Sequence, residues 1–296
     1  MKALGRDTRH LLISVAPGAL CIGVFLVLPS LYLMAMAFLS TGPYGLSALP
    51  LSLQAFRELA GFGFLCWSPG NLYTLLRSIW QSALATVLVI AIAYPAAYYI
   101  ATRALRWRAI LLLAVVVPSW TNQVIRSVGW MNLFAPGAPV SNVAAGLNLI
   151  EPAMGLFPSQ FAVIVGLVYN FLPFMVLPLY AAFERLDYGQ IEAAQDLFAR
   201  PGAVFRHAVL PQTLPGLMAG TVLVAIPAFG MYVVTELLGG GKATMVGNLV
   251  AEQFSQSSNW PLGAAGAIIM IVMTLIGLRV LRRLGQRLGG EHEVVL

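Results

Sequence analysis

Residues 159–182 read SQFAVIVGLVYNFLPFMVLPLYAA and contain no charged side chain. About 20 apolar residues in a helix are enough to cross the hydrocarbon core of a bilayer, so this stretch is long enough to span a membrane. Further apolar runs lie at residues 11–39, 73–101, 109–127, 214–238 and 263–281. Hydrophobic residues make up 59% of the chain and charged residues 9%, whereas a soluble domain carries about 25% charged residues. We therefore predict an all-α, polytopic membrane protein with six transmembrane helices, forming a single transmembrane domain over residues 1–296.

The positions of the basic residues predict the orientation of these helices. Lys and Arg are concentrated in the segments that remain in the cytoplasm. A cytoplasmic N-terminus places most of the 17 basic residues on that side, namely Lys2, Arg6, Arg9, Arg103, Arg106, Arg108, Arg185, Arg200, Arg206, Arg279, Arg282, Arg283 and Arg287. Six spans then put both termini in the cytoplasm. Because the run at 11–39 lacks a small-residue cleavage site, we expect it to be a retained helix and not a removed signal peptide.

The sequence offers no catalytic or metal-binding constellation. The histidines lie near predicted cytoplasmic ends and form no cluster of metal ligands: they are His10, His207 and His292. Residues 239–244 (GGGKAT) have the composition of a phosphate-binding loop, but Lys242 is followed by alanine, and Glu236 stands where that motif has its first glycine. We expect a turn there. The chain is therefore predicted not to be an enzyme and to bind no cofactor.

The segment at residues 184–216 is polar enough to leave the membrane, and it is predicted to contain a helix. Asp187 and Gln190 have the spacing of a capping box, in which each side chain satisfies a free backbone N–H at the helix start. Apolar positions then recur at helical spacing, at Tyr188, Ile191, Ala194 or Gln195, and Phe198. The Pro201-Gly202 pair is expected to end the helix.

The charges of this helix fit the same prediction. Asp187, Glu192 and Asp196 place negative charge toward its N-terminal half, where the helix dipole favours an anion. Such a helix is too short to cross a bilayer, so its apolar stripe is expected to lie against the membrane or against a partner protein. Amphipathicity alone favours an ordinary amphipathic connector.

The residues of this segment resemble the EAA loop of ABC importer permeases. That family has the pattern E-A-A, three residues, Gly, nine residues, Ile-x-Leu-Pro, and this chain matches it at Glu192-Ala193-Ala194 and at Leu210-Pro211. Phe198 replaces the family's Gly, and Ala208 replaces its Ile. We expect Gly202 to supply the unusual backbone conformation instead.

The resemblance implies a type I ABC importer permease fold in the bacterial inner membrane, with 184–216 as a coupling loop that docks on an ATPase subunit. The residues expected to couple the chain to the ATPase are Asp187, Ile191, Glu192, Ala193, Ala194, Asp196, Phe198, Leu210 and Pro211. The implied partners are a second permease subunit, two ATPase subunits that bind ATP and Mg, an external solute-binding protein, a small-molecule substrate and membrane lipid. No nucleic acid is expected.

Several further stretches are similar to the polyamine branch of these permeases, in particular to the first of its two permease subunits. They are FLPFMVLPLY at 171–180, ELLGG at 236–240, NWP at 259–261 and the region from Trp120 to Trp130. The resemblance implies import of spermidine or putrescine. Glu236 is the only acid in the fifth run, and a carboxylate near aromatic rings suits an organic cation, to which each ring adds about 0.5–2 kcal/mol. The expected substrate-path residues are therefore Glu236, Tyr232, Phe229, Trp130 and Trp120.

Several alternatives remain open at this point. Glu236 could form a structural ion pair with Lys242 or with the second permease subunit, and the aromatic residues could be interfacial anchors. Glu151 and Glu252, in predicted outer loops, could meet a solute-binding protein or be solvated. The solute could be an aminophosphonate or an opine-like compound. A secondary transporter or channel, and a membrane scaffold or enzyme, are the other classes.

Overall fold

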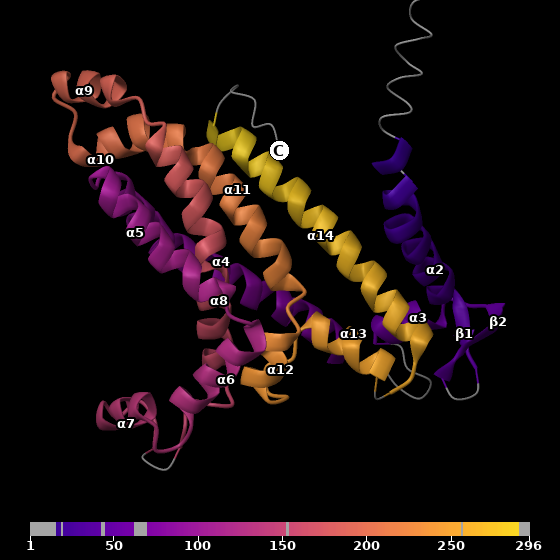
Figure 1. Ribbon diagram of the computed structural model, residues 1–296. Helices are drawn as coiled ribbons and strands as arrows, with labels where there is room; N and C mark the ends of the chain where they lie inside the picture. The colour runs from indigo at the N-terminus through magenta and orange to yellow at the C-terminus, as the bar shows by residue number, and fades with distance from the viewer. Residues whose placement is uncertain are drawn as a thin grey trace, which may run out of the picture. The chain divides into compact units, whose positions relative to one another are not determined.

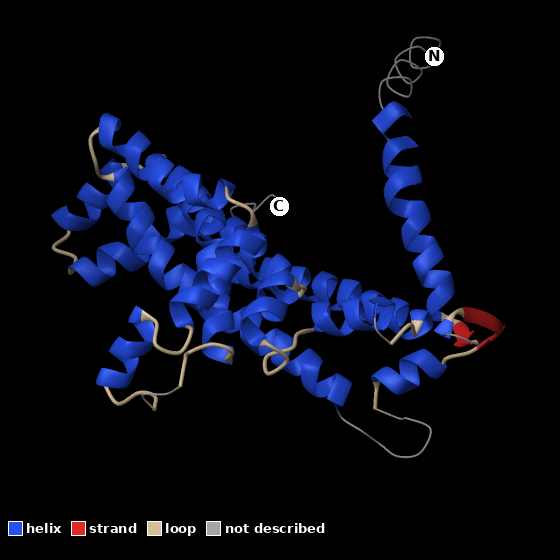
Figure 2. Cartoon of the chain, turned by 60° about the horizontal axis from the view of Figure 1, so that its bottom comes forward, coloured by secondary structure: helices blue, strands red, loops and turns tan. Residues whose placement is uncertain are grey.

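The computed structural model describes residues 16–18, 20–42, 45–61, 70–151, 154–255 and 257–289. The N-terminal basic residues, His10 and His292 used in the sequence analysis lie outside these ranges. Two short strands are described (Figure 2), β1 (Leu39–Thr41) and β2 (Ser47–Leu51). The helices (Figure 1) are α2 (Leu28–Ala37), α3 (Gln54–Leu59), α4 (Gly70–Ala101), α5 (Leu105–Val116), α6 (Gln123–Phe134), α7 (Pro139–Gly146), α8 (Gln160–Glu184), α9 (Tyr188–Asp196), α10 (Pro201–Val204), α11 (Leu210–Phe229), α12 (Val233–Gly239), α13 (Val246–Ser255) and α14 (Trp260–Gly289).

The described helices include five that are long and apolar enough to cross a membrane. They are Ala16–Ala37, Gly70–Ala101, Gln160–Glu184, Pro201–Phe229 and Trp260–Arg287. A sixth is obtained if the bent pair formed by Leu105–Trp120 and Gln123–Phe134 counts as one span. The prediction of an all-α, six-span membrane protein is confirmed on that count.

The third predicted run, 109–127, is not one straight helix. α5 passes into a tight 3₁₀ turn at Val117–Trp120, and α6 then leaves at an angle of 93°. Pro118 in this turn lacks a backbone donor. The side-chain oxygen of Asn122 accepts a hydrogen bond of 2.8 Å from the N–H of Val124, and it thereby caps the new helix. The bend therefore has a local chemical cause.

The fifth predicted run, 214–238, is also interrupted, and it begins earlier than predicted. A continuous helical path leads from Pro201 through a π-helical turn at Phe205–Val209 to Phe229, so Leu210 and Pro211 lie within a helix. The chain breaks between Phe229 and Val233, and α12 follows. Gly247 approaches this break so closely that a Cβ there would be 2.5 Å from the carbonyl oxygen of Gly230.

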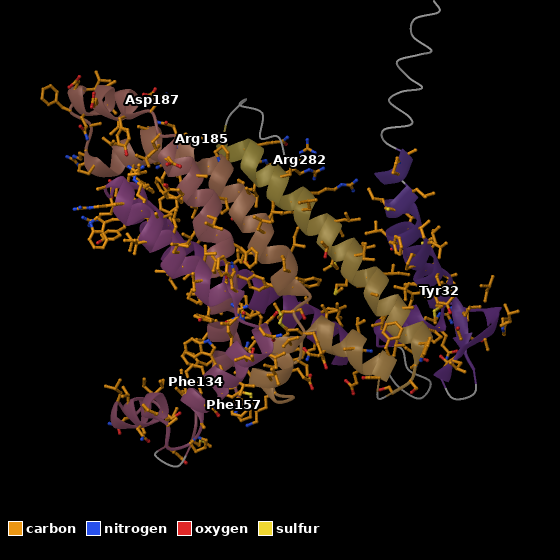
Figure 3. All side chains as sticks on the ribbon, viewed as in Figure 1. Tyr32, Phe134, Phe157, Arg185, Asp187 and Arg282 are labelled. Carbon is orange, nitrogen blue, oxygen red and sulfur yellow. The ribbon has the colours of Figure 1, made fainter. Side chains whose placement is uncertain are left out.

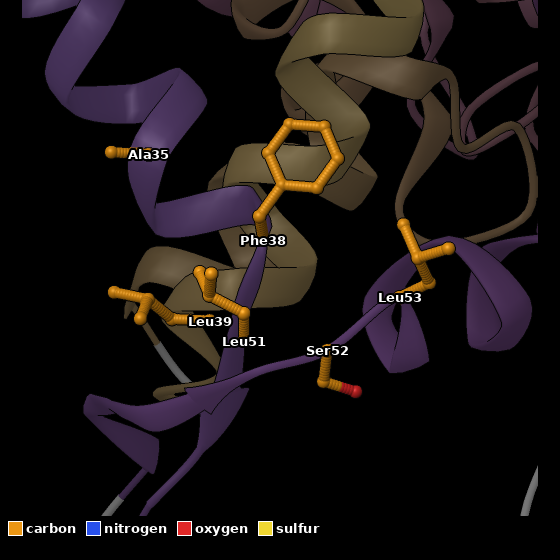
Figure 4. A pocket seen from close by; sticks show the side chains of 6 residues that line it. All are labelled: Ala35, Phe38, Leu39, Leu51, Ser52 and Leu53. Atoms are coloured by element: carbon orange, nitrogen blue, oxygen red, sulfur yellow. The ribbon is translucent and has the colours of Figure 1, made fainter.

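The chain divides into two compact units, one of residues up to 72 with 250–269, and one of residues 73–249 with 270 onward. In the first unit β1 and β2 pair antiparallel, and the rings of Phe38 and Phe56 lie 5.3 Å apart. Figure 4 shows an apolar pocket of about 510 Å³ in this unit, lined by Ala35, Phe38, Leu39, Leu51, Ser52 and Leu53. The assignment of 1–296 as a single domain stays a prediction.

The core of the second unit is built on the pairing of α8 with α11. Gly216 lies against the Pro178–Ala182 turn of α8, where an added Cβ would be 2.6 Å from both the Pro178 carbonyl oxygen and the Ala182 Cβ. One turn later an added Cβ at Gly220 would be 2.5 Å from the sulfur atom of Met175. Small residues four apart allow two helix backbones to approach closely within a membrane.

Candidate functional site

The predicted coupling residues and the predicted solute-path acid lie at opposite ends of the second unit. α9 and α10 lie at one end of α8 and α11, whereas α6, α7 and α12 lie at the other (Figure 1). Figure 3 shows Arg185, Asp187 and Arg282 at the α9 end and Phe134 and Phe157 at the α12 end. The two groups of predicted site residues therefore form two separate sites.

Asp187 begins α9, but only half of the predicted capping box is present. Its Oδ1 accepts a hydrogen bond of 2.9 Å from the N–H of Gly189. The side chain of Gln190 contacts Asp187 Oδ2 at 3.3 Å and not the backbone N–H. The backbone N–H of Asp187 instead donates to Oε1 of Gln212 at 2.8 Å. The Nε2 of Gln212 in turn donates to the Ala208 carbonyl oxygen. α9 is thus tied to α11 by a residue that the sequence analysis missed.

Replacing Gln212 by alanine is expected to loosen the start of α9. The Asp187 N–H loses its partner, which costs about 0.5–1.5 kcal/mol locally. Hydrogen exchange of residues 187–196 should become faster, as measured by mass spectrometry on the purified protein. Gln190→Ala is the matched control, because it removes only the longer side-chain contact to the same aspartate. Equal acceleration in both variants would contradict the assigned tie.

The end of α9 differs from the prediction in three respects. The helix ends at Asp196, before the Pro201-Gly202 pair, and Pro201 begins α10 instead. Asp196 therefore occupies the C-terminal turn, where the helix dipole disfavours a carboxylate. Phe198 itself has a positive φ of 54°, whereas Gly202 is helical. The expectation that Gly202 supplies the unusual conformation is wrong.

Phe198 occupies the position that glycine normally takes in a Schellman cap. Its N–H donates to the Gln195 carbonyl oxygen at 2.8 Å, and the Ala199 N–H donates to that of Ala194 at 3.2 Å. These two bonds form the Schellman pattern. A left-handed conformation costs a residue with a side chain about 1–2 kcal/mol. The Phe198 side chain is 96% exposed and that of Leu197 is 81% exposed, so two large apolar side chains project from the tip of the loop.

The opposite face of α9 covers a cavity of about 660 Å³. Ile191 is half-buried, and it lines this cavity together with Glu192 and the aromatic residues Tyr94, Tyr98 and Phe183. Ala193 is exposed and Ala194 is half-buried. The apolar stripe predicted for this helix therefore faces the end of the helical bundle, and Phe198 is not part of that lining.

At the other end of the unit, Glu236 is exposed on α12, and its carboxylate is hydrogen bonded to an uncharged side chain. Its Oε2 accepts a hydrogen bond of 2.7 Å from Nδ2 of Asn248. Its N–H donates to the carbonyl oxygen of Tyr232, so the two predicted path residues share one turn. Both Glu236 and Lys242 are described, and they form no ion pair with each other. An intrachain ion pair with Lys242 is therefore not what holds Glu236.

The other aromatic residues of the predicted path have different surroundings. Trp130 on α6 is half-buried against Tyr169, with ring centroids 5.5 Å apart. Phe229 is 7% exposed and lines a separate apolar cavity of about 520 Å³ between α4, α11 and α14. Trp120 is 75% exposed, beside the bend between α5 and α6. The structure brings Tyr232 and Glu236 together and does not bring Phe229 or Trp120 to them.

Asn248 and Thr235 support Glu236, and neither was predicted from the sequence. Thr235 is 1% exposed and Asn248 is 5% exposed, and their side chains hydrogen bond to each other. The only signal for them in the sequence is that each is a polar residue in an apolar setting. Their contact depends on the reversal of the chain at Gly240 and Gly241, which both have positive φ.

Broken membrane-crossing helices, with an amphipathic helix held outside the bundle, define a polytopic membrane protein. Residues 107–290 match the family described as binding-protein-dependent transport system inner membrane component, and the chain belongs to this family. It is a multi-pass inner-membrane protein and a transport permease rather than an enzyme.

Among curated relatives, the chain is 34% identical over 270 residues to the spermidine/putrescine transport system permease protein PotB of Haemophilus influenzae, covering 91% of this chain and 92% of the relative. It is 33% identical to PotB of Escherichia coli strain K12, covering 92% and 96%. A bacterial alginate ABC transporter solved with an alginate-bound periplasmic protein shares the fold, with a TM-score of 0.72 at 17% identity, covering 98% of each chain.

Proposed function

We propose that this chain is the permease subunit of an ATP-driven importer that carries spermidine or putrescine across the inner membrane. The observation that carries the proposal is the 33–34% identity to PotB over about nine-tenths of both chains. The exposed carboxylate of Glu236 beside Tyr232 supports it, because an aliphatic polycation is recognised by charge pairing together with aromatic faces.

The importer contains a second permease subunit, two ATPase subunits that bind ATP and Mg, and an external solute-binding protein. α9 and the exposed tip at Leu197 and Phe198 dock on an ATPase subunit. Arg185 and Arg282 at the α9 end support a cytoplasmic location for that end and for both termini. Glu236 at the other end then faces the solute that the binding protein delivers.

The two sites lie at opposite ends of the unit. A conformational change that begins at the ATPase subunits must therefore pass along this chain to affect the solute path. Association of the ATPase subunits moves α9, and the hydrogen bond from Asp187 to Gln212 transmits that movement to α11. The break after Phe229 allows α12 to reorient while α11 stays intact. ATP binding thus opens the path outward, and hydrolysis restores the inward-facing state.

The test is solute-stimulated ATPase activity of the complete transporter in lipid, together with its binding protein. Spermidine and putrescine should stimulate the wild type. In Glu236→Gln the spermidine concentration for half-maximal stimulation should rise about tenfold, because a charge-assisted contact is lost. Glu58→Gln, the same chemical change at a half-buried glutamate on α3 that belongs to neither site, is the matched control and should behave like the wild type.

Each result decides between specific alternatives. If an aminophosphonate or an uncharged solute stimulates while polyamines do not, the importer class stands and the polyamine assignment fails. If transport continues when residues 187–200 are deleted, the protein is a secondary transporter or a channel and not an ATP-driven importer.

A further inference from the structure

We propose that Asn248 is a positioning residue, which holds the Glu236 carboxylate in one orientation and leaves its charge available to a primary or secondary ammonium group of the solute. This inference rests on the proposed function, because it assumes that Glu236 faces a cationic solute. It adds a residue on the next helix, α13, to the recognition of that solute.

The hydrogen bonds fix which end of the Asn248 amide faces Glu236. The Oδ1 of Asn248 accepts from the backbone N–H of Met245 at 3.1 Å. A backbone N–H can only donate, so this end of the amide must be the oxygen and the other end must be the NH₂ group. The NH₂ group then donates to Glu236 Oε2 at 2.7 Å.

Thr235 strengthens this arrangement without determining it. Its hydroxyl lies within hydrogen-bonding distance of Asn248 Oδ1 and also of the carbonyl oxygens of Met231 and Tyr232. A hydroxyl has a single proton, so these three acceptors compete for it. The N–H of Met245 has no such choice, and it is the contact that sets the orientation of the amide.

The support for Asn248 is itself anchored to another helix. The N–H of Val246 donates to Ser78 Oγ on α4 at 2.8 Å. Ser78, Met245 and Val246 are fully buried. Asn248 is therefore held between α4 and α12. Its amide group has a fixed position, and this fixes the orientation of the Glu236 carboxylate.

The chemistry of this partner explains why a carboxylate here can still bind a cation. An amide donor stabilises the carboxylate but adds no positive charge, whereas Lys or Arg at position 248 would neutralise it. Only Oε2 is engaged by Asn248, and among the described residues Oε1 of Glu236 has no hydrogen-bond partner. Glu236 thus presents one unbonded carboxylate oxygen in a fixed position, and no cationic side chain among the described residues pairs with it.

The test combines Asn248→Asp, Glu236→Gln and the double variant in the complete transporter. Asn248→Asp keeps the shape and an acceptor for the Met245 N–H, but it sets two carboxylates against each other. The spermidine concentration for half-maximal ATPase stimulation should rise about tenfold, with a lower melting temperature. Asn132→Asp, the same chemical change at an exposed asparagine on α6, is the control and should alter neither quantity.

The double variant separates positioning from a structural role. The new amide at position 236 could donate to the new carboxylate at position 248, which restores the hydrogen bond with the amide and the carboxylate exchanged. The melting temperature should therefore recover, while the spermidine response stays about tenfold weaker, because the charge is then on a buried side chain. Recovery of both quantities would show that the pair is structural and would overturn the inference.

The remaining outcomes distinguish the inference from the function on which it rests. If the wild type responds to spermidine and Asn248→Asp responds at the same concentration, the inference alone fails. If the wild type does not respond to spermidine, the proposed function fails, and the assignment of Asn248 fails with it.

Discussion

Gly216→Val is expected to destabilise the folded protein strongly and to lower its melting temperature in detergent by about 5–10 °C. The new Cβ would lie 2.6 Å from the Pro178 carbonyl oxygen. This atom belongs to the backbone of α8, so it cannot move aside as the end of a flexible side chain could. α8 and α11 would have to separate, and the contacts along their shared face would be weakened together.

The measurement is thermal unfolding, in which the fraction of folded protein that remains after heating is determined by size-exclusion chromatography. Gly129→Val on α6 is the matched control, because a Cβ at Gly129 meets nothing within 4 Å. Both substitutions replace a helical glycine by a β-branched residue, so they share the same change in helix propensity. A similar loss of stability in both variants would show that valine in a helix, and not the close approach to α8, is responsible.

Phe198→Gly and Phe198→Ala are both expected to weaken the stimulation of ATP hydrolysis by the solute. If the exposed ring docks on the ATPase, both variants lose that contact, and stimulation should fall about tenfold, as for an aromatic hot spot. They differ in strain, because residue 198 has a φ of 54°, which glycine adopts without strain, whereas alanine bears the same strain as phenylalanine. Phe198→Gly should therefore leave the loop more stable than in the wild type.

The assay is ATPase stimulation and subunit association of the reconstituted transporter, together with hydrogen exchange at residues 194–200. If Phe198→Gly retains full stimulation and Phe198→Ala does not, the release of backbone strain in the glycine variant offsets the loss of the ring. Full stimulation in both variants would remove Phe198 from the proposed coupling surface.

Length and hydrophobicity were enough to predict the unbroken spans. The runs at 73–101, 159–182 and 263–281 correspond to α4, α8 and α14, because uninterrupted apolar stretches in lipid have to form helices. The breaks in the third and fifth runs could not be located in this way. Each depends on a specific contact, the Asn122 cap in one case and the approach of Gly247 to Gly230 in the other.

The candidate sites were predictable to the extent that their chemistry is local. Asp187 as the cap of α9 follows from its position before a helical pattern. Gln212 and Asn248 could not be identified, because each meets its partner only after a turn of the chain brings two helices together. The conformation of Phe198 was mispredicted because residue preference favours Gly202, whereas the cap geometry of α9 determines where the left-handed residue falls.

The continuous helical path from Pro201 to Phe229 connects the α9 end of the unit with the α12 end. Its α11 part has 20 residues, which corresponds to a length of about 30 Å at about 1.5 Å per residue, similar to the thickness of the hydrocarbon core. If α11 tilts as a unit by about 10° about one end, the other end moves by about 5 Å on this geometry. A small rotation at the α9 end of this helix would therefore displace its Phe229 end by about the width of an alkyl chain.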